Sequence, residues 1–195
     1  MNKELAYSVV VIGGSAGSFS AVMHILKTIP PNFSVPVVVC MHRLKHVNSG
    51  YKETLELISE NKVIEPFHND ILQAGCIYIA PANYHIMVES DAKIMFSTEE
   101  LVNYSRPSID VLFRSAAYSF GKKVLGIILS GAHTDGADGL RDIHVSKGTT
   151  IVQNPSEAEV STMPQAAIDK MKPSYILHLQ SIEAFLQILH TEQQY

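Results

Sequence analysis

The chain has 195 residues, of which 46% are hydrophobic and 17% are charged, a composition typical of one compact domain spanning residues 1–195 and not of a disordered chain. A net charge of -4 with scattered Lys and Arg residues excludes the concentrated basic surface of a nucleic-acid-binding protein. No apolar run approaches the ~20 residues that span a bilayer, and no signal-peptide core is present, so we expect a cytoplasmic protein without membrane insertion. Cys40 and Cys76 form no disulfide framework, which agrees with a reducing compartment.

Hydrophobic patterns predict strands that alternate with helices along the chain. The first strand is an uninterrupted β-branched run, as expected of a strand covered on both faces of a parallel sheet. Strands are predicted at 7–12, 35–40, 76–80, 84–89, 93–96, 124–129, 149–152 and 175–177. Helices are predicted at 19–29, after Ser49, from Pro107 to Gly121, up to about Gly148, after Pro164 and from Ser181.

The order of these elements predicts the topology. Residues 7–40 form a strand, helix, strand unit, so the first two strands should be parallel neighbours with their carboxyl ends side by side. The turn at 90–92 should join 84–89 to 93–96 as an antiparallel hairpin. The predicted fold is therefore α/β: a doubly wound, mostly parallel sheet with helices on both faces and an antiparallel hairpin at one edge.

A glycine-rich turn follows the first strand, where Gly13 to Gly17 match the pattern G-x-S-x-G. Between a strand and a helix, this motif makes a sharp turn that presents a serine hydroxyl, so Ser15 is a candidate nucleophile. The amides that open the next helix point toward developing negative charge, and the Ala16 N–H is the first candidate oxyanion donor. The alternative is a phosphate-binding or dinucleotide-binding turn, but the dinucleotide fingerprint needs an acidic residue where this chain has His42.

Two further side chains are expected at the same rim of the sheet. His42 ends the strand beside the one that carries Ser15, about 5 Å away, although a histidine at a strand end is by itself more often structural. Asp135 follows another buried strand and can accept the second imidazole N–H of His42, which would complete a triad. Its alternatives are an Asx turn or a helix N-cap, with Asp138 as the rival carboxylate. The order Ser, His, Asp differs from that of α/β-hydrolases, so we expect the same chemistry on another fold.

Longer motifs extend from the first strand to the final helix. They are Ile-Gly-Gly-Ser-Ala-Gly-Ser at 12–18, Ile-Tyr-Ile-Ala-Pro-Ala-Asn-Tyr-His at 77–85, Ser-Arg-Pro-Ser-Ile-Asp-Val-Leu-Phe at 105–113, Ile-Leu-Ser-Gly through Asp-Gly-Ala-Asp-Gly-Leu at 128–140, and Met163-Pro164 with Ala167-Ile168. These motifs resemble those of the catalytic domain of chemotaxis response-regulator protein-glutamate methylesterases. The resemblance implies that Ser15, His42 and Asp135 are catalytic, and that the chain hydrolyses glutamate methyl esters, and deamidates glutamine, on chemoreceptor helices.

The chain departs from that family pattern in three places. Ala132-His133 replaces the usual Met-Gly beside the oxyanion region, so both residues are candidates for oxyanion or substrate binding with altered packing. Ala16 and Met41 replace the common Thr and Gln, which leaves those side-chain roles open. The family usually carries an N-terminal receiver domain, whereas six residues precede the first predicted strand here, so we expect control by a separate receiver or signalling protein.

The predicted acyl transfer needs no metal or organic cofactor. Arg106 is a candidate contact for receptor carboxylates, and its alternative is a solvated or structurally paired arginine. His42 and His46 are four residues apart, but the sequence lacks a metal motif with recognised spacing. Two other functions stay open, namely a non-catalytic flavodoxin-like module whose glycine-rich turn binds a phosphate or a partner loop, and a serine hydrolase of another small ester or amide.

Overall fold

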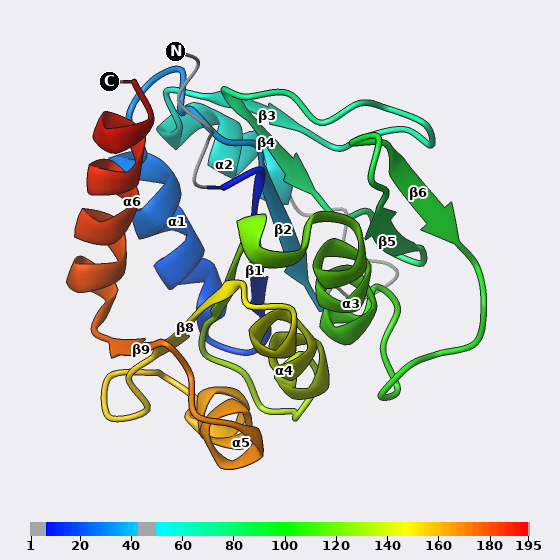
Figure 1. Cartoon of the computed structure of the whole chain (residues 1–195), viewed down its shortest axis with the longest axis vertical. Helices are drawn as coiled ribbons and strands as arrows, with labels where there is room; N and C mark the ends of the chain where they lie inside the picture. The colour runs from blue at the N-terminus through cyan, green and yellow to red at the C-terminus, as the bar shows by residue number, and fades with distance from the viewer. Residues whose placement is uncertain (1–6, 43–49, 195) are drawn as a thin grey trace.

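The structure is a computed structural model that describes residues 7–42 and 50–194, and its centre is a parallel sheet (Figure 1). The seven-stranded sheet has the order β3-β4-β2-β1-β7-β8-β9, and every pair within it is parallel. Its strands are β1 (Val9–Gly14), β2 (Val37–Met41), β3 (Lys62–Ile64), β4 (Cys76–Ile79), β7 (Val124–Ile128), β8 (Thr149–Gln153) and β9 (Tyr175–Leu177). The α/β doubly wound prediction is therefore confirmed, as is the parallel pairing of the first two strands.

Helices cover both faces of the sheet, as Figure 1 shows. One face packs against α1 (Ser18–Thr28), α2 (Tyr51–Ile58) and α6 (Leu179–Gln194), and the other against α3 (Ile109–Phe120), α4 (Ala137–Val145) and α5 (Thr162–Lys170). Successive strand residues point to opposite faces, so Val10 and Ile12 join the first cluster while Val9 and Val11 join the second. Burial on both sides explains the continuous β-branched run that marked β1 in the sequence.

The predicted hairpin forms from β5 (His85–Val88) and β6 (Ile94–Ser97), but its position differs from the prediction. It is a separate two-stranded sheet and not an edge of the large one. Its strand β5 bonds to α3 instead, because Ser115 Oγ accepts the Val88 N–H at 3.1 Å and Ser119 Oγ donates to the Val88 carbonyl at 2.9 Å. The hairpin thus buries its apolar side chains in the same cluster as α3.

Helix starts and short edges also differ from the sequence predictions. Pro107 lies before the helix, since Ser108 is the N-cap of α3. The last two helices begin at Thr162 and Leu179, earlier than predicted, and the three-residue edge strand β3 was not predicted. A proline in a first turn removes no needed N–H donor, which is why Pro164 fits inside α5. Within the described ranges, no helix combines the length and apolar character needed to cross a bilayer.

Candidate active site

Ser15 and His42 leave neighbouring strands at the same level. Gly14 pairs with Met41 in the β1–β2 register, and the His42 N–H donates to the Gly14 carbonyl at 3.4 Å, one step beyond it. Each residue therefore follows directly on the end of its strand, at the carboxyl rim where open α/β sheets bind ligands. Ser15 is half-buried and the His42 side chain is 17% exposed, so this rim is open to a substrate.

The turn that carries Ser15 is held by hydrogen bonds to Ser18 and Ser130. The Ser15 N–H donates to the Ser130 carbonyl at 2.9 Å, and the Ser15 carbonyl accepts from Ser18 Oγ at 2.6 Å. Ser130 Oγ donates to the Ala16 carbonyl at 2.8 Å. The loop after β7 thus fixes the turn that carries Ser15 at two consecutive residues, a contact that periodicity in the sequence could not reveal.

Close packing explains the glycines of this turn. Gly17 has φ 74°, and a Cβ there would lie 2.6 Å from Glu159 Cβ. A Cβ on Gly14 would lie 2.5 Å from Ser18 Oγ. This turn therefore uses glycine for close approach at Gly14, which is a variable position of the motif, and for both close approach and a left-handed backbone at the motif glycine Gly17.

Asp135 contacts His42 directly. The imidazole Nε2 lies 2.7 Å from Asp135 Oδ2, and Asp135 is fully buried. An ionised carboxylate only accepts hydrogen bonds, so Nε2 carries the proton and Nδ1 keeps the lone pair. The structure thus brings the predicted base and the predicted acid together.

The Asp135 carboxylate accepts hydrogen bonds from several donors besides His42. These are Asn103 Nδ2 at 3.0 Å, Ser108 Oγ at 2.8 Å, and the N–H groups of Ile109 at 2.7 Å and Asp110 at 3.2 Å. Burial by itself would raise the pKa of Asp135, but the hydrogen bonds from His42, Asn103, Ile109 and Ser108 outweigh it and lower the pKa to about 2. The acid is therefore ionised at neutral pH.

A second buried carboxylate, Asp110, lies beside the first. Its Oδ1 accepts the N–H groups of Gly136 at 2.9 Å and Gly139 at 2.7 Å, at the start of α4. Burial raises the pKa of Asp110, and the nearby Asp135 charge adds to the increase despite the hydrogen bond from Gly139. Two helix N-termini thus stabilise two neighbouring negative charges.

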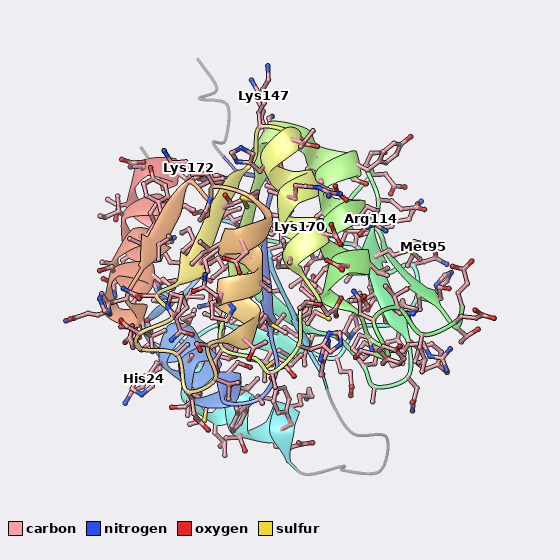
Figure 2. The ribbon with its side chains drawn as sticks, turned by 90° about the horizontal axis from the view of Figure 1, so that it is seen from below. His24, Met95, Arg114, Lys147, Lys170 and Lys172 are labelled. Carbon is pink, nitrogen blue, oxygen red and sulfur yellow. The ribbon has the colours of Figure 1, made fainter. Side chains whose placement is uncertain are left out.

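The rival carboxylate, Asp138, faces away toward the surface. Its Oδ1 pairs with Lys170 Nζ at 2.8 Å and with Arg141 Nη1 at 3.1 Å. Figure 2 labels Lys170 on α5 and Arg114 on α3, the helices on either side of α4. Asp138 therefore joins surface ion pairs, while Asp135 is the carboxylate that meets His42.

The predicted oxyanion residues lie on two loops that are tied together. Ala16 and Ala132 are exposed, and neither backbone N–H donates to an acceptor within the described part of the chain. His133 is half-buried; its Nδ1 accepts the Asp135 N–H at 3.2 Å, and its ring lies 6.4 Å from the Tyr104 ring in an edge arrangement. His133 thus supports the loop of the acid, and its predicted role in binding substrate stays a prediction.

Arg106 is anchored within the chain. Its Nη1 donates to the carbonyls of Thr98 at 2.6 Å and Glu99 at 2.7 Å. These bonds tie the loop before α3 to the segment after β6. A contact with substrate carboxylates therefore needs the remaining guanidinium donors, and that role stays a prediction.

No cluster that could hold a metal ion occurs in 7–42 and 50–194, and His46 lies outside the described residues. Sequence reasoning gave no role to Asn103, Ser108, Asp110 or Ser130. Ser108 and Asp110 stand within the motif at 105–113, which could have drawn attention to them. Ser130 stands within the motif at 128–140, which gave the same signal, whereas Asn103 lies outside these motifs and its partner Asp135 is distant in sequence.

Comparison with known proteins identifies the family of the chain. Residues 10–186 match the family described as CheB methylesterase. A putative protein-glutamate methylesterase/protein-glutamine glutaminase of Leptospira interrogans is 39% identical over 183 residues, covering 93% of this chain and 95% of that protein. The protein-glutamate methylesterase FrzG of Myxococcus xanthus is 33% identical over 92% of this chain, which spans only 54% of FrzG.

The fold has a solved counterpart. The crystal structure of the Thermotoga maritima CheB methylesterase catalytic domain superposes with a TM-score of 0.88 at 28% identity, covering 94% of this chain and 98% of that one. The same family thus accounts for the sequence match over most of the chain and for the arrangement of its strands and helices. The chain belongs to the CheB methylesterase family.

Proposed function

We propose that the chain hydrolyses glutamate methyl esters on chemoreceptor helices, with Ser15 as nucleophile, His42 as base and Asp135 as orienting acid. The observation that carries the proposal is the 2.7 Å bond between His42 Nε2 and the buried, ionised Asp135, directly beside the strand end that presents Ser15. The match to CheB methylesterases and the names of the relatives support the ester as substrate.

In the first step, His42 Nδ1 takes the Ser15 hydroxyl proton while Ser15 Oγ attacks the ester carbonyl carbon. The imidazolium is stabilised by Asp135 through the Nε2–H bond. His42 then returns that proton to the methoxy oxygen, the carbon–oxygen bond breaks, and methanol leaves a glutamyl-serine ester. Water, deprotonated by His42, cleaves this ester and restores both the free glutamate and Ser15.

The oxyanion of each tetrahedral intermediate needs hydrogen-bond donors. The N–H groups of Ala16 and Ala132 are the proposed donors, because both belong to exposed loops that Ser130 holds together. A glutamine side chain passes through the same intermediate with ammonia as the leaving group. Deamidation is therefore a proposed second activity, supported by the glutaminase in the name of the Leptospira relative.

The proposed partners are the cytoplasmic helices of chemoreceptors and a separate receiver or signalling protein, with Arg106 meeting receptor carboxylates. The competing function is a binding module without turnover. An aryl phosphonate that modifies activated serines separates the two, because a binding module has no activated hydroxyl to label.

The direct test measures methanol release from methyl-labelled receptor membranes. We expect Ser15→Ala to lose at least about 10³-fold in rate. Ser20→Ala is the matched control, because Ser20 is an exposed residue of α1 with no place in the site, and it should keep the wild-type rate. Equal release by wild type and Ser15→Ala would contradict the proposal.

A further inference from the structure

Asn103 contacts both buried carboxylates. Its Nδ2 lies 2.7 Å from Asp110 Oδ2 and 3.0 Å from Asp135 Oδ1. An amide nitrogen carries two hydrogens, so one N–H is available for each carboxylate. Among the described residues, Asn103 is the one side chain with hydrogen bonds to both Asp110 and Asp135.

The two oxygens of Asp135 have different partners. Oδ2 meets His42 and the Ile109 N–H, whereas Oδ1 accepts from Asn103, Ser108 and the Asp110 N–H. Fixing Oδ1 therefore determines the direction in which Oδ2 faces the imidazole. The Asn103 bond is the one that also reaches the neighbouring negative charge.

We propose that Asn103 is a positioning residue for the catalytic acid: its amide bridges Asp110 and Asp135 and holds the Asp135 carboxylate in the orientation that meets His42. The inference rests on the proposed function and adds a residue to it. Without Asn103, the two carboxylates lose the donor that they share, and their mutual repulsion is no longer offset by it. Asp135 then keeps its bonds from Ser108 and from the N–H groups of Ile109 and Asp110, but the carboxylate shifts enough to weaken its bond to His42.

The backbone of Asn103 sets the choice of test variant. Its φ of 52° lies in the left-handed region, which Gly adopts without strain and Asn or Asp tolerate. Asn103→Gly thus removes the amide and keeps the turn. Asn103→Asp keeps the shape but places a third carboxylate against the other two. Asn69 offers a matched control, because it is exposed, has φ 72°, and its side chain is not bonded to Asp135.

The first measurement is steady-state ester hydrolysis with thermal melts of every variant. We expect Asn103→Gly to lose about 10- to 100-fold in kcat with little change in KM, and Asn103→Asp to lose more. Asn69→Gly should keep the wild-type kcat. In the Asp135→Asn background, Asn103→Gly should add less than about a twofold loss, because it acts through Asp135. If the fold-loss in kcat of the double variant equals the product of the fold-losses of the two single variants, the proposal is overturned.

A second measurement does not depend on turnover. Proton NMR of the intact chain should show the His42 Nε2–H as a slowly exchanging downfield signal in wild type and Asn69→Gly, and Asn103→Gly should lose or shift it. If wild type shows no esterase activity but the signal still depends on Asn103, the proposed function fails and the positioning role stands. If Asn103→Gly leaves both turnover and the signal unchanged, the positioning role is wrong.

Discussion

Asp110, in α3, accepts a backbone hydrogen bond at the start of α4, and Asp135, just before α4, accepts one at the start of α3. Asp135 Oδ1 accepts the Asp110 N–H at 3.2 Å, and Asp110 Oδ1 accepts the N–H of Gly136, the residue after Asp135, at 2.9 Å. The reciprocal bonds join the starts of α3 and α4. The acid of the proposed triad is therefore fixed by two helices and not by its loop alone, the kind of rigid support that a catalytic geometry needs.

Replacing Asp135 with Asn should nearly abolish hydrolysis. An amide at this position presents an N–H to His42 Nε2, which favours the tautomer with a proton on Nδ1, where the Ser15 proton must go. We expect kcat to fall about 10⁴-fold, as for comparable triads. Asp138→Asn is the control, since Asp138 pairs only with surface residues, and it should keep kcat within about twofold. A large loss in Asp138→Asn with none in Asp135→Asn would reverse the assignment.

Asp135 should also make stability depend on acid pH. Its pKa of about 2 in the folded chain lies below the unfolded value, so its ionisation stabilises the fold above about pH 4, and this contribution is lost as pH falls toward 2. The pH-dependent part is about 2 kcal/mol. Asp110 acts in the opposite direction, because a raised pKa favours the folded chain at low pH. Urea unfolding should show that the difference in free energy of unfolding between wild type and Asp135→Asn narrows by this amount between pH 4 and pH 2. A difference of constant size would contradict the prediction.

Gly17→Ala should be far more damaging than Gly50→Ala. Both glycines have positive φ, at 74° and 54°, so each substitution costs about 1 kcal/mol in backbone strain. At Gly17 the added methyl meets Glu159 Cβ at 2.6 Å, whereas at Gly50 it has no described residue within 4 Å. We expect Gly17→Ala to lower both the free energy of unfolding and the phosphonate labelling rate of Ser15. Equal effects of the two substitutions on both measurements would show that packing at Gly17 is unimportant.

Arg106→Glu distinguishes a substrate contact from a structural anchor. A contact with receptor carboxylates predicts a KM for receptor raised about tenfold or more, with unchanged phosphonate labelling of Ser15. Loss of the bonds to Thr98 and Glu99 instead predicts a lower melting temperature and equal losses in both assays. Arg114→Glu is the control for surface charge, because Arg114 is an exposed residue of α3 paired with Asp142. A normal KM in Arg106→Glu would end the substrate role.

The alternation of strands and helices could be predicted from the sequence alone, and with it the positions of Ser15 and His42 after the ends of two paired strands. Both results depend on local order: β-branched runs identify buried strands, and a strand, helix, strand unit makes neighbouring parallel strands whose ends coincide. The glycine turn was equally local, since G-x-S-x-G describes one bend of the backbone.

Spacing alone left Asp135 and Asp138 open and the family resemblance favoured Asp135, whereas the contact with His42 and the groups that hold the carboxylate there became visible in the tertiary structure. Asp135 and Asp138 are three residues apart and equally polar, and the packing of α4 against α3 and α5 sends one into the site and the other to Lys170. Asn103 reaches Asp135 across 32 residues of chain, and the hairpin packs on α3 instead of the sheet. Such contacts depend on how distant elements pack, which no local periodicity records.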